Sequence, residues 1–161
     1  MKTLDYLHLD SKKVGKTVKS LQQLLADFQV YYANLRGFHW NIKGSSFFTL
    51  HSKFEEMYDD AAEKVDEIAE RILMLNGVPA NKFSDYLKVA TIKEVSDITS
   101  GKDAVKNILE SLSVLIQAER KIMEEAGESG DESTVSMLND YLVEQEKMVW
   151  MFVAYLDESK K

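Results

Sequence analysis

The sequence predicts an all-α protein, a bundle of four long amphipathic helices. Apolar residues recur every three or four positions through most of the 161 residues, which is the spacing of one helix face. Only seven glycines and one proline occur, too few for a sandwich or a solenoid rich in turns. There are no cysteines, so disulfide frameworks, thiolate metal sites and cysteine nucleophiles are excluded.

The first two helices are predicted from apolar stripes on either side of a short turn. The turn covers residues 41–46, where asparagine, glycine and two serines interrupt the helical pattern. The second helix ends at Asn76 and Gly77, with Pro79 just beyond, which is typical of a helix C-terminus. The two stripes consist of Val14, Val18, Leu21, Leu25, Phe28, Tyr32, Leu35 and Phe38, and of Phe47, Leu50, Phe54, Met57, Ala61, Val65, Ile68 and Ile72.

Residues 78–100 form the longest connection, and apolar residues between positions 83 and 89 indicate a short helix within it. Ser100 is a good N-cap for the third helix, and Asp131 is one for the fourth. Short links inside each half and one long crossover between the halves are the connections of a ferritin-like four-helix bundle. We expect a single domain over residues 1–161, with a short N-terminal tail at about residues 1–10.

Charge and hydropathy restrict the function. Twenty basic against 27 acidic residues give a formal net charge of −7, which disfavours a protein whose main task is to grip nucleic acid phosphates. No apolar run reaches the roughly 18–20 residues that a membrane span needs, and the N-terminus lacks the apolar segment of a signal peptide. We therefore expect a cytoplasmic protein without membrane contact.

The second helix has three faces on a helical wheel drawn at about 100° per residue. One face is the apolar stripe given above. A second face, which we expect to be solvated, consists of Lys53, Glu56, Asp60, Lys64, Glu67 and Arg71. The third face combines metal-ligand side chains with apolar ones, namely His51, Glu55, Asp66 and Glu70 with Phe48, Ala62, Ala69 and Leu73. A surface of that kind usually meets another chain.

The spacing on the third face rules out one metal site within one helix. His51 and Glu55 are four positions apart and can reach a common point, and so are Asp66 and Glu70. Glu55 and Asp66 share a direction, but their separation along the sequence puts them roughly 16 Å apart along the axis. Metal–ligand bonds are only about 2.0–2.2 Å long. Two antiparallel copies around a two-fold axis would bring the two pairs together and create two equivalent sites per dimer.

His39 completes the predicted ligand set, because the turn returns the chain so that the end of the first helix lies at the depth of His51. The candidate metal site thus contains His39, His51 and Glu55 from one subunit with Asp66 and Glu70 of the partner subunit. Imidazole and carboxylate ligands suit Fe(II), Zn(II) or Mn(II). Three carboxylates would largely offset the charge of two divalent cations and leave room for oxidation to Fe(III).

Each residue taken singly has a plainer interpretation. A lone histidine is often a helix-end or interface residue, and a lone acid on a long helix is usually surface charge. Trp40 is either a packing residue or one that lies against the metal site. The terminal lysines either contact DNA phosphates or only aid solubility, and neighbouring acids favour solubility. These lysines are Lys2, Lys12, Lys13, Lys16, Lys160 and Lys161.

Four motifs surround the candidate ligands. They are His39-Trp40-Asn41-Ile42-Lys43-Gly44, Phe47-Phe48-Thr49-Leu50-His51, Phe54-Glu55 and Asp66-Glu67-Ile68-Ala69-Glu70-Arg71. Together they strongly resemble the signature of the Dps mini-ferritins, the DNA-binding proteins from starved cells. The resemblance extends over the whole chain, including Gly130-Asp131-Glu132 and Trp150-Met151. The acid after the second histidine is often Asp in relatives, and Glu55 keeps the carboxylate with a longer reach.

The resemblance implies a hollow dodecamer of four-helix subunits, with ferroxidase centres for two iron ions at the two-fold interfaces. The ligands of that family match His39, His51, Glu55, Asp66 and Glu70 in this sequence. The resemblance also implies that Fe(II) is oxidised by hydrogen peroxide in preference to dioxygen, and that the ferric mineral is stored inside the cage. Such chemistry protects cells against oxidative stress.

Two features depart from the family pattern. Acidic residues near the start of the last helix line three-fold iron-entry pores in relatives. Asp131 and Glu132 fit that pattern, whereas Ser136 stands where many relatives have Asp. Relatives that condense DNA often carry a long lysine-rich tail, and the tail here is short and mixed in charge. Weak or absent DNA binding is therefore predicted.

Two other functions compete with this one. An ordinary ferritin, with its di-iron centre inside one bundle, needs Glu-x-x-His motifs. Arg36 and Phe48 stand three positions before the two histidines, so that motif is absent. The other alternative is a nucleoid-associated protein that coats DNA and has little redox role.

Overall fold

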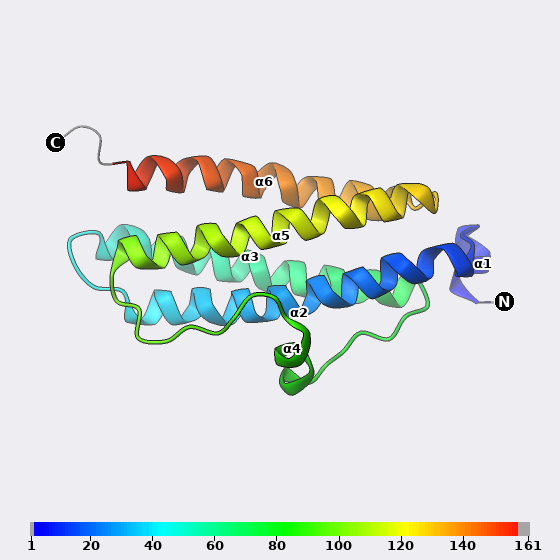
Figure 1. Cartoon of the computed structure of the whole chain (residues 1–161), viewed down its shortest axis with the longest axis horizontal. Coiled ribbons are helices and arrows are strands. Elements are labelled where there is room, and N and C mark those ends of the chain that lie inside the picture. The colour runs from blue at the N-terminus through cyan, green and yellow to red at the C-terminus, as the bar shows by residue number, and fades with distance from the viewer. Residues whose placement is uncertain (1, 158–161) are drawn as a thin grey trace.

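The computed structural model describes residues 2–157, which form six helices (Figure 1). The helices are α1 (Thr3–Leu7), α2 (Ser11–Asn41), α3 (Phe47–Met74), α4 (Phe83–Val89), α5 (Gly101–Glu128) and α6 (Glu132–Leu156). Both predicted N-caps are confirmed, because the Ser100 side chain accepts a hydrogen bond at the start of α5 and the Asp131 side chain accepts one at the start of α6. Within the described residues, no helix is long and apolar enough to cross a membrane.

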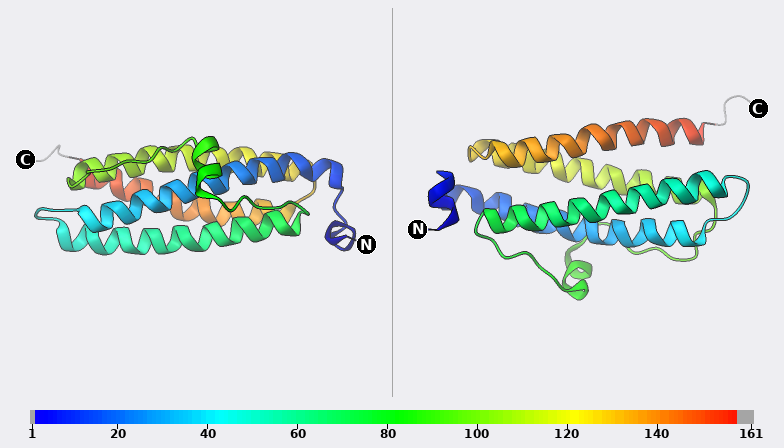
Figure 2. Two further views of the ribbon diagram at one scale, coloured as in Figure 1. Left: turned by 90° about the horizontal axis from the view of Figure 1, so that it is seen from below. Right: turned by 180° about the vertical axis from the view of Figure 1, so that it is seen from behind.

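The four long helices form two antiparallel hairpins, α2 with α3 and α5 with α6 (Figures 1 and 2). Between the hairpins the chain runs back along the bundle, so that α5 begins at the same end as α3 (Figure 1). α2 packs against both α3 and α5, and α5 packs against α6. This all-α arrangement, with the short helix α4 between the long helices, is the ferritin-like bundle predicted from the connection lengths.

The apolar stripes predicted from the sequence meet in the centre of the bundle. Phe28 of α2 and Phe54 of α3 are fully buried there, together with Leu115 of α5 and Leu138 of α6. Full burial of one such side chain stabilises the folded state by about 1.5–3 kcal/mol. The edges of the two N-terminal stripes are only partly buried, at Val18, Tyr32, Phe47 and Val65.

Polar side chains of α2 hold the crossover in place. The buried Asp27 carboxylate accepts hydrogen bonds from the backbone N–H groups of Thr91, at 2.6 Å, and Ile92, at 2.9 Å. Asn34 donates to the carbonyl of Lys93 and accepts from the backbone of Val95. Because each bond satisfies a backbone group of an irregular segment, the crossover can lie against the helices without leaving those groups unpaired.

Two charged residues of α3 are not solvated as predicted. Lys64 is 4% exposed, and its ammonium bonds to Asp60 and, at 2.7 Å, to Glu144 of α6. It also lies 5.0 Å from the centre of the Tyr141 ring. Burial by itself lowers the pKa of Lys64, but the hydrogen bonds to the two carboxylates outweigh it and raise the pKa. The long lysine side chain reaches its partners across the gap between two helices.

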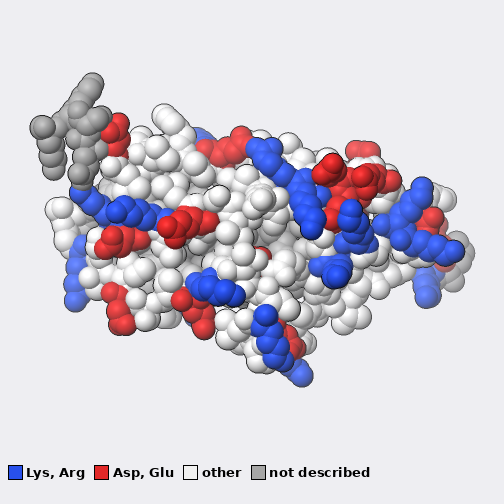
Figure 3. Space-filling view, viewed as in Figure 1, with Lys and Arg blue, Asp and Glu red and all other residues white. Residues whose placement is uncertain are grey.

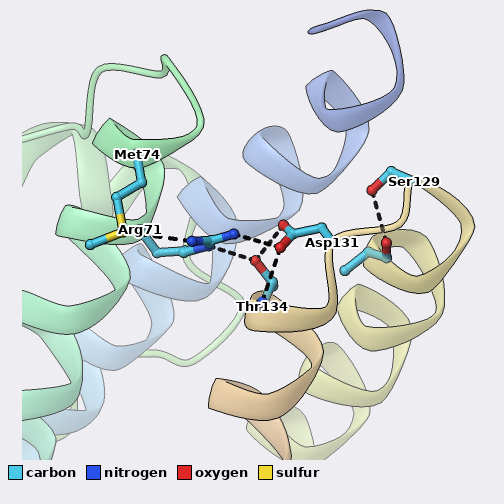
Figure 4. A network of polar contacts seen from close by, with 6 residues as sticks. Arg71, Met74, Ser129, Asp131 and Thr134 are labelled. Atoms are coloured by element: carbon cyan, nitrogen blue, oxygen red, sulfur yellow. Dashed lines mark hydrogen bonds and ion pairs between the residues drawn. The ribbon is translucent and has the colours of Figure 1, made fainter. Parts of the chain in front are cut away.

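Arg71 is the second buried charge on this face. Its guanidinium bonds to the carboxylate of Asp131 and, at 2.9 Å, to the hydroxyl of Thr134 (Figure 4). The same carboxylate accepts the Thr134 hydroxyl and backbone N–H, so it also caps α6. The contact therefore joins the last turns of α3 to the first turn of α6.

The N-terminal segment, expected to be a tail, contains the short helix α1. Leu4 is buried, and its carbonyl accepts hydrogen bonds from the backbone N–H groups of His8 and Leu9. His8 adopts a left-handed conformation that ends the helix. Lys160 and Lys161, named above as terminal lysines, lie outside the described residues.

Candidate metal centre

The turn between α2 and α3 brings the two candidate histidines side by side. Ile42 is buried at the end of α2, and the chain reverses through Gly44 before α3 begins at Phe47. Gly44 has a φ of 103°, a conformation that side-chain-bearing residues rarely adopt, so glycine is required at this point. The tight reversal places His39, in the last turn of α2, next to His51, near the start of α3.

His39 and His51 stack on each other and exchange hydrogen bonds. Their ring centres are 3.8 Å apart and their planes differ by 17°. The Nδ1 atom of His39 lies 2.7 Å from the carbonyl oxygen of His51, and Nδ1 of His51 lies 2.8 Å from the carbonyl oxygen of His39. A carbonyl oxygen only accepts, so both Nδ1 atoms carry the hydrogen.

These two hydrogen bonds fix which nitrogen of each imidazole ring carries the hydrogen. In a neutral imidazole with a proton on Nδ1, the Nε2 atom has a free lone pair and can bind a metal. A hydrogen bond from the other ring nitrogen to a carbonyl is the usual support of a metal-binding histidine. The backbone thus holds both rings through Nδ1 and leaves both Nε2 atoms free of these bonds, a feature that the spacing of the sequence did not reveal.

Aromatic residues enclose the paired rings. Phe47 stacks on His51 with ring centres 4.9 Å apart, and Tyr58 meets His39 edge-on at 5.3 Å. The pKa of the Tyr58 phenol is raised, first by desolvation and then by the negative charge of Glu55 and Asp59. Tyr58 therefore contacts one candidate imidazole ligand and feels the charge of one candidate carboxylate ligand.

The three candidate carboxylates are exposed and open to a partner. Glu55, Asp66 and Glu70 make no hydrogen bond or ion pair with any residue in the range 2–157. Within that range, no three His, Asp or Glu side chains are close enough to hold a metal ion together. Phe48 is 84% exposed and Leu73 is 53% exposed on the same helix. A single chain thus presents the three candidate carboxylates on an exposed, partly apolar surface and does not gather them with the histidines.

Trp40, predicted to pack or to lie against the site, is 65% exposed. The guanidinium of Arg36 lies 4.9 Å from the centre of its ring and 5.1 Å from the ring of Tyr32. Within this chain the indole therefore contacts Arg36 in a cation–π arrangement. It stands on the outside of α2, one position beyond His39.

Asp131, one of the two predicted pore residues, is enclosed by its neighbours within this chain, and the pore itself stays a prediction. This residue is 1% exposed, and its carboxylate is occupied by Arg71 and Thr134 (Figure 4). A carboxylate that caps a helix and pairs with a buried guanidinium does not offer its oxygens to passing cations. Glu132, the other predicted pore residue, is exposed and makes no hydrogen bond within the described chain. Ser136 is exposed as well.

The sequence is similar to proteins of known family over nearly its whole length. A ferritin-like domain family matches residues 18–161. The DNA protection during starvation protein of Porphyromonas gingivalis is 52% identical over 154 residues, which cover 96% of this chain and 97% of that protein. An uncharacterized protein of Haemophilus influenzae is 45% identical over 146 residues, covering 91% of each chain.

Solved structures agree with the sequence comparison. The DPS protein of Vibrio cholerae O1 is described as a member of a broad superfamily of ferritin-like diiron-carboxylate proteins. It superposes with a TM-score of 0.91 at 48% identity, over 92% of this chain and 94% of that one. The Dps protein of Bacillus brevis gives a TM-score of 0.88 at 34% identity, over 92% of this chain and 100% of that one. The chain is therefore a member of the Dps family within the ferritin-like superfamily.

Proposed function

We propose that the protein is a ferroxidase and iron store. Two ferrous ions bind where His39, His51 and Glu55 of one subunit meet Asp66 and Glu70 of the partner subunit. Hydrogen peroxide takes one electron from each iron and is reduced without release of hydroxyl radical. The ferric product is stored as mineral inside a hollow dodecamer in the cytoplasm, which protects the cell against oxidative stress.

The observation that carries this proposal is the division of the ligands along α3. The paired imidazoles and Glu55 lie at one end, while Asp66 and Glu70 lie at the other end with no partner in the described chain. Unpaired carboxylates beside exposed apolar side chains are what an incomplete half-site presents. Neutral imidazoles and carboxylates match the ligand preference of Fe(II), and three anionic ligands favour Fe(III) further.

A mixed-subunit experiment tests the shared site directly. His51→Ala and Asp66→Ala should each slow peroxide-driven Fe(II) oxidation strongly while the assembly stays intact. When the two variants are co-expressed, each mixed dimer contains one site built from two intact halves and one site that lacks both groups. Random pairing should therefore restore about a quarter of the wild-type activity.

The controls of this experiment are the two single variants and a mixture made after assembly. That mixture should stay as slow as the single variants, because its two-fold contacts formed before the variants were combined. If co-expression restores no activity, or if either single variant oxidises Fe(II) at the wild-type rate, the shared-site proposal is wrong.

The alternative role as a DNA-coating protein has less support. Lysines and acids are interleaved on the face seen in Figure 3, and no uniformly basic surface is visible there. Twelve copies, each with a formal charge of −7, would carry a charge of about −84, which repels a polyanion. We therefore propose that DNA binding is weak or absent.

A further inference from the structure

Most methionines of this chain lie along one groove. The sequence has seven, and five of them line connected cavities between α3 and α6: Met57, Met74, Met137, Met148 and Met151. The larger part of the groove has a volume of about 600 Å³ and contains Met74 and Met137. A second part of about 380 Å³ contains Met57, Met148 and Met151.

Core filling explains only part of this distribution. Met57 belongs to the buried core, at 7% exposure, although the largest fully buried side chains of the bundle are phenylalanines, leucines and isoleucines. Met148 is only partly buried and Met151 is 41% exposed. A leucine would fill an apolar wall as well as methionine does, so the thioether sulfur is the chemical property that distinguishes this surface.

The second part of the groove brings three thioethers to one place from two helices. Met148 and Met151 are three positions apart on α6 and share a face, while Met57 approaches from α3. Met57 and Met148 also line a small inner cavity of about 50 Å³ that extends between the helices. Flexible methionine side chains can turn their sulfurs toward a common centre at little cost.

We propose that Met57, Met148 and Met151 form a binding site for a soft monovalent cation, Cu(I) or its redox-inert analogue Ag(I). Thioether sulfur binds Cu(I) in preference to harder ions such as Mg²⁺ or Mn²⁺. Three neutral sulfur ligands suit a single positive charge. The carboxylates on the walls of the same cavity are already paired, Glu56 with Lys53, and Asp60 and Glu144 with Lys64, so the proposal depends on the thioethers and not on local charge.

This site is separate from the proposed iron site in residues and in chemistry. None of the three methionines belongs to the five candidate iron ligands, and thioethers are poor ligands for hard Fe(III). The two proposals can therefore fail independently.

The test is a titration of the assembled protein with Ag(I) in chloride-free nitrate buffer, followed by calorimetry and native mass spectrometry. The variant is Met57→Leu/Met148→Leu/Met151→Leu, which keeps the apolar volume and removes the sulfurs. It should bind one Ag(I) fewer per chain than the wild type, or bind that ion at least about tenfold more weakly. Its melting temperature and its rate of Fe(II) oxidation should stay at the wild-type level.

The matched control is Met74→Leu/Met137→Leu at the other end of the groove, which should retain the wild-type number of Ag(I) ions. Equal Ag(I) binding by the wild type and the triple variant would overturn the proposal, as would the absence of binding by the wild type. Loss of the same ion from the control variant would also overturn it, because binding would then not depend on the three named sulfurs.

Discussion

Arg71 and Asp131 form a buried ion pair between the C-terminal end of α3 and the N-terminus of α6. Arg71 is 9% exposed and Asp131 is 1% exposed, so neither charge is well solvated. Glu70, a candidate iron ligand, is the residue before Arg71. The pair therefore fixes the position of α3 at the point where the second half of the proposed metal site lies.

Removal of the guanidinium should destabilise the fold. Arg71→Met leaves the Asp131 carboxylate buried beside an apolar side chain, and the loss of one partner of a buried pair typically costs about 3–5 kcal/mol. Denaturant unfolding followed by circular dichroism measures the change. The control is Lys88→Met, which removes a lysine whose ion pair with Asp85 is exposed and should change stability little. Equal stability of the two variants would contradict the structural role given to Arg71.

The buried carboxyl of Glu119 should make stability depend on pH. Its Oε1 atom accepts a hydrogen bond from Gln145 at 2.7 Å. Burial raises its pKa to about 8, against the opposing effects of the Gln145 hydrogen bond and the positive charges of Lys64 and Arg120. The folded state therefore retains a proton that the unfolded chain releases at lower pH. The Glu119 carboxyl therefore lowers the free energy of unfolding progressively as pH rises from the ordinary pKa of glutamate to about 8. Above that pH its effect on the free energy of unfolding is constant.

Glu119→Gln is the matched variant, since an amide cannot lose its proton in this range. Thermal or urea unfolding between pH 5 and 9 should show a flatter dependence on pH for the variant than for the wild type. One titrating group changes the free energy of unfolding by at most about 1.4 kcal/mol per pH unit. Other titratable residues also face this region, and they are the same in the wild type and the variant: Tyr31, Asp60, Lys64 and Tyr141. Parallel pH profiles would show that Glu119 does not titrate as stated.

Phe48 should be required for assembly. Its side chain is 84% exposed, and the only ring that it contacts within the described chain is that of Phe47. Phe48→Asp places a charge on the face that carries the candidate ligands, so it should reduce both the oligomer mass and Fe(II) oxidation. Light scattering and an iron-oxidation assay measure the two effects. Phe48→Leu keeps an apolar surface and should retain both properties. A Phe48→Asp protein of full oligomer mass would show that the two-fold contact lies elsewhere.

Duplex DNA should not be retarded by the assembled protein in a gel at about 150 mM salt. The negative net charge and the interleaved lysines and acids in Figure 3 supply the reason. A weak shift that disappears as salt rises would fit scattered phosphate contacts. A shift that persists at high salt would show a specific DNA-binding surface.

The helices could be predicted from the sequence because residues close together in the chain determine where each helix begins and ends. The caps at Ser100 and Asp131, the break at Gly44 and the apolar stripes of α2 and α3 depend on residues close together in the sequence. The short helix in the crossover was indicated in the same way, and the structure places it at Phe83–Val89. The division of the candidate ligands followed from helix geometry alone.

Features that depend on other helices were not predictable. Lys64 and Arg71 lie on a charged sector of the α3 wheel, and only the presence of Glu144 and Asp131 on α6 explains their burial. Asp131 in turn does not face solvent because its carboxylate is held by Arg71 and Thr134. No periodicity could show that α6 returns to this side of α3, since the wheel of one helix contains no information about its neighbours.

The exchange of hydrogen bonds between His39 and His51 has a consequence for the proposed iron site. Each subunit holds its two nitrogen lone pairs in fixed directions before a second copy arrives, so the entropic cost of ordering these rings is met during folding of the hairpin. The orientation of the rings depends on main-chain carbonyls and on the path through Gly44. If the proposed site is correct, a change in that loop would therefore slow Fe(II) oxidation even when every candidate ligand is kept.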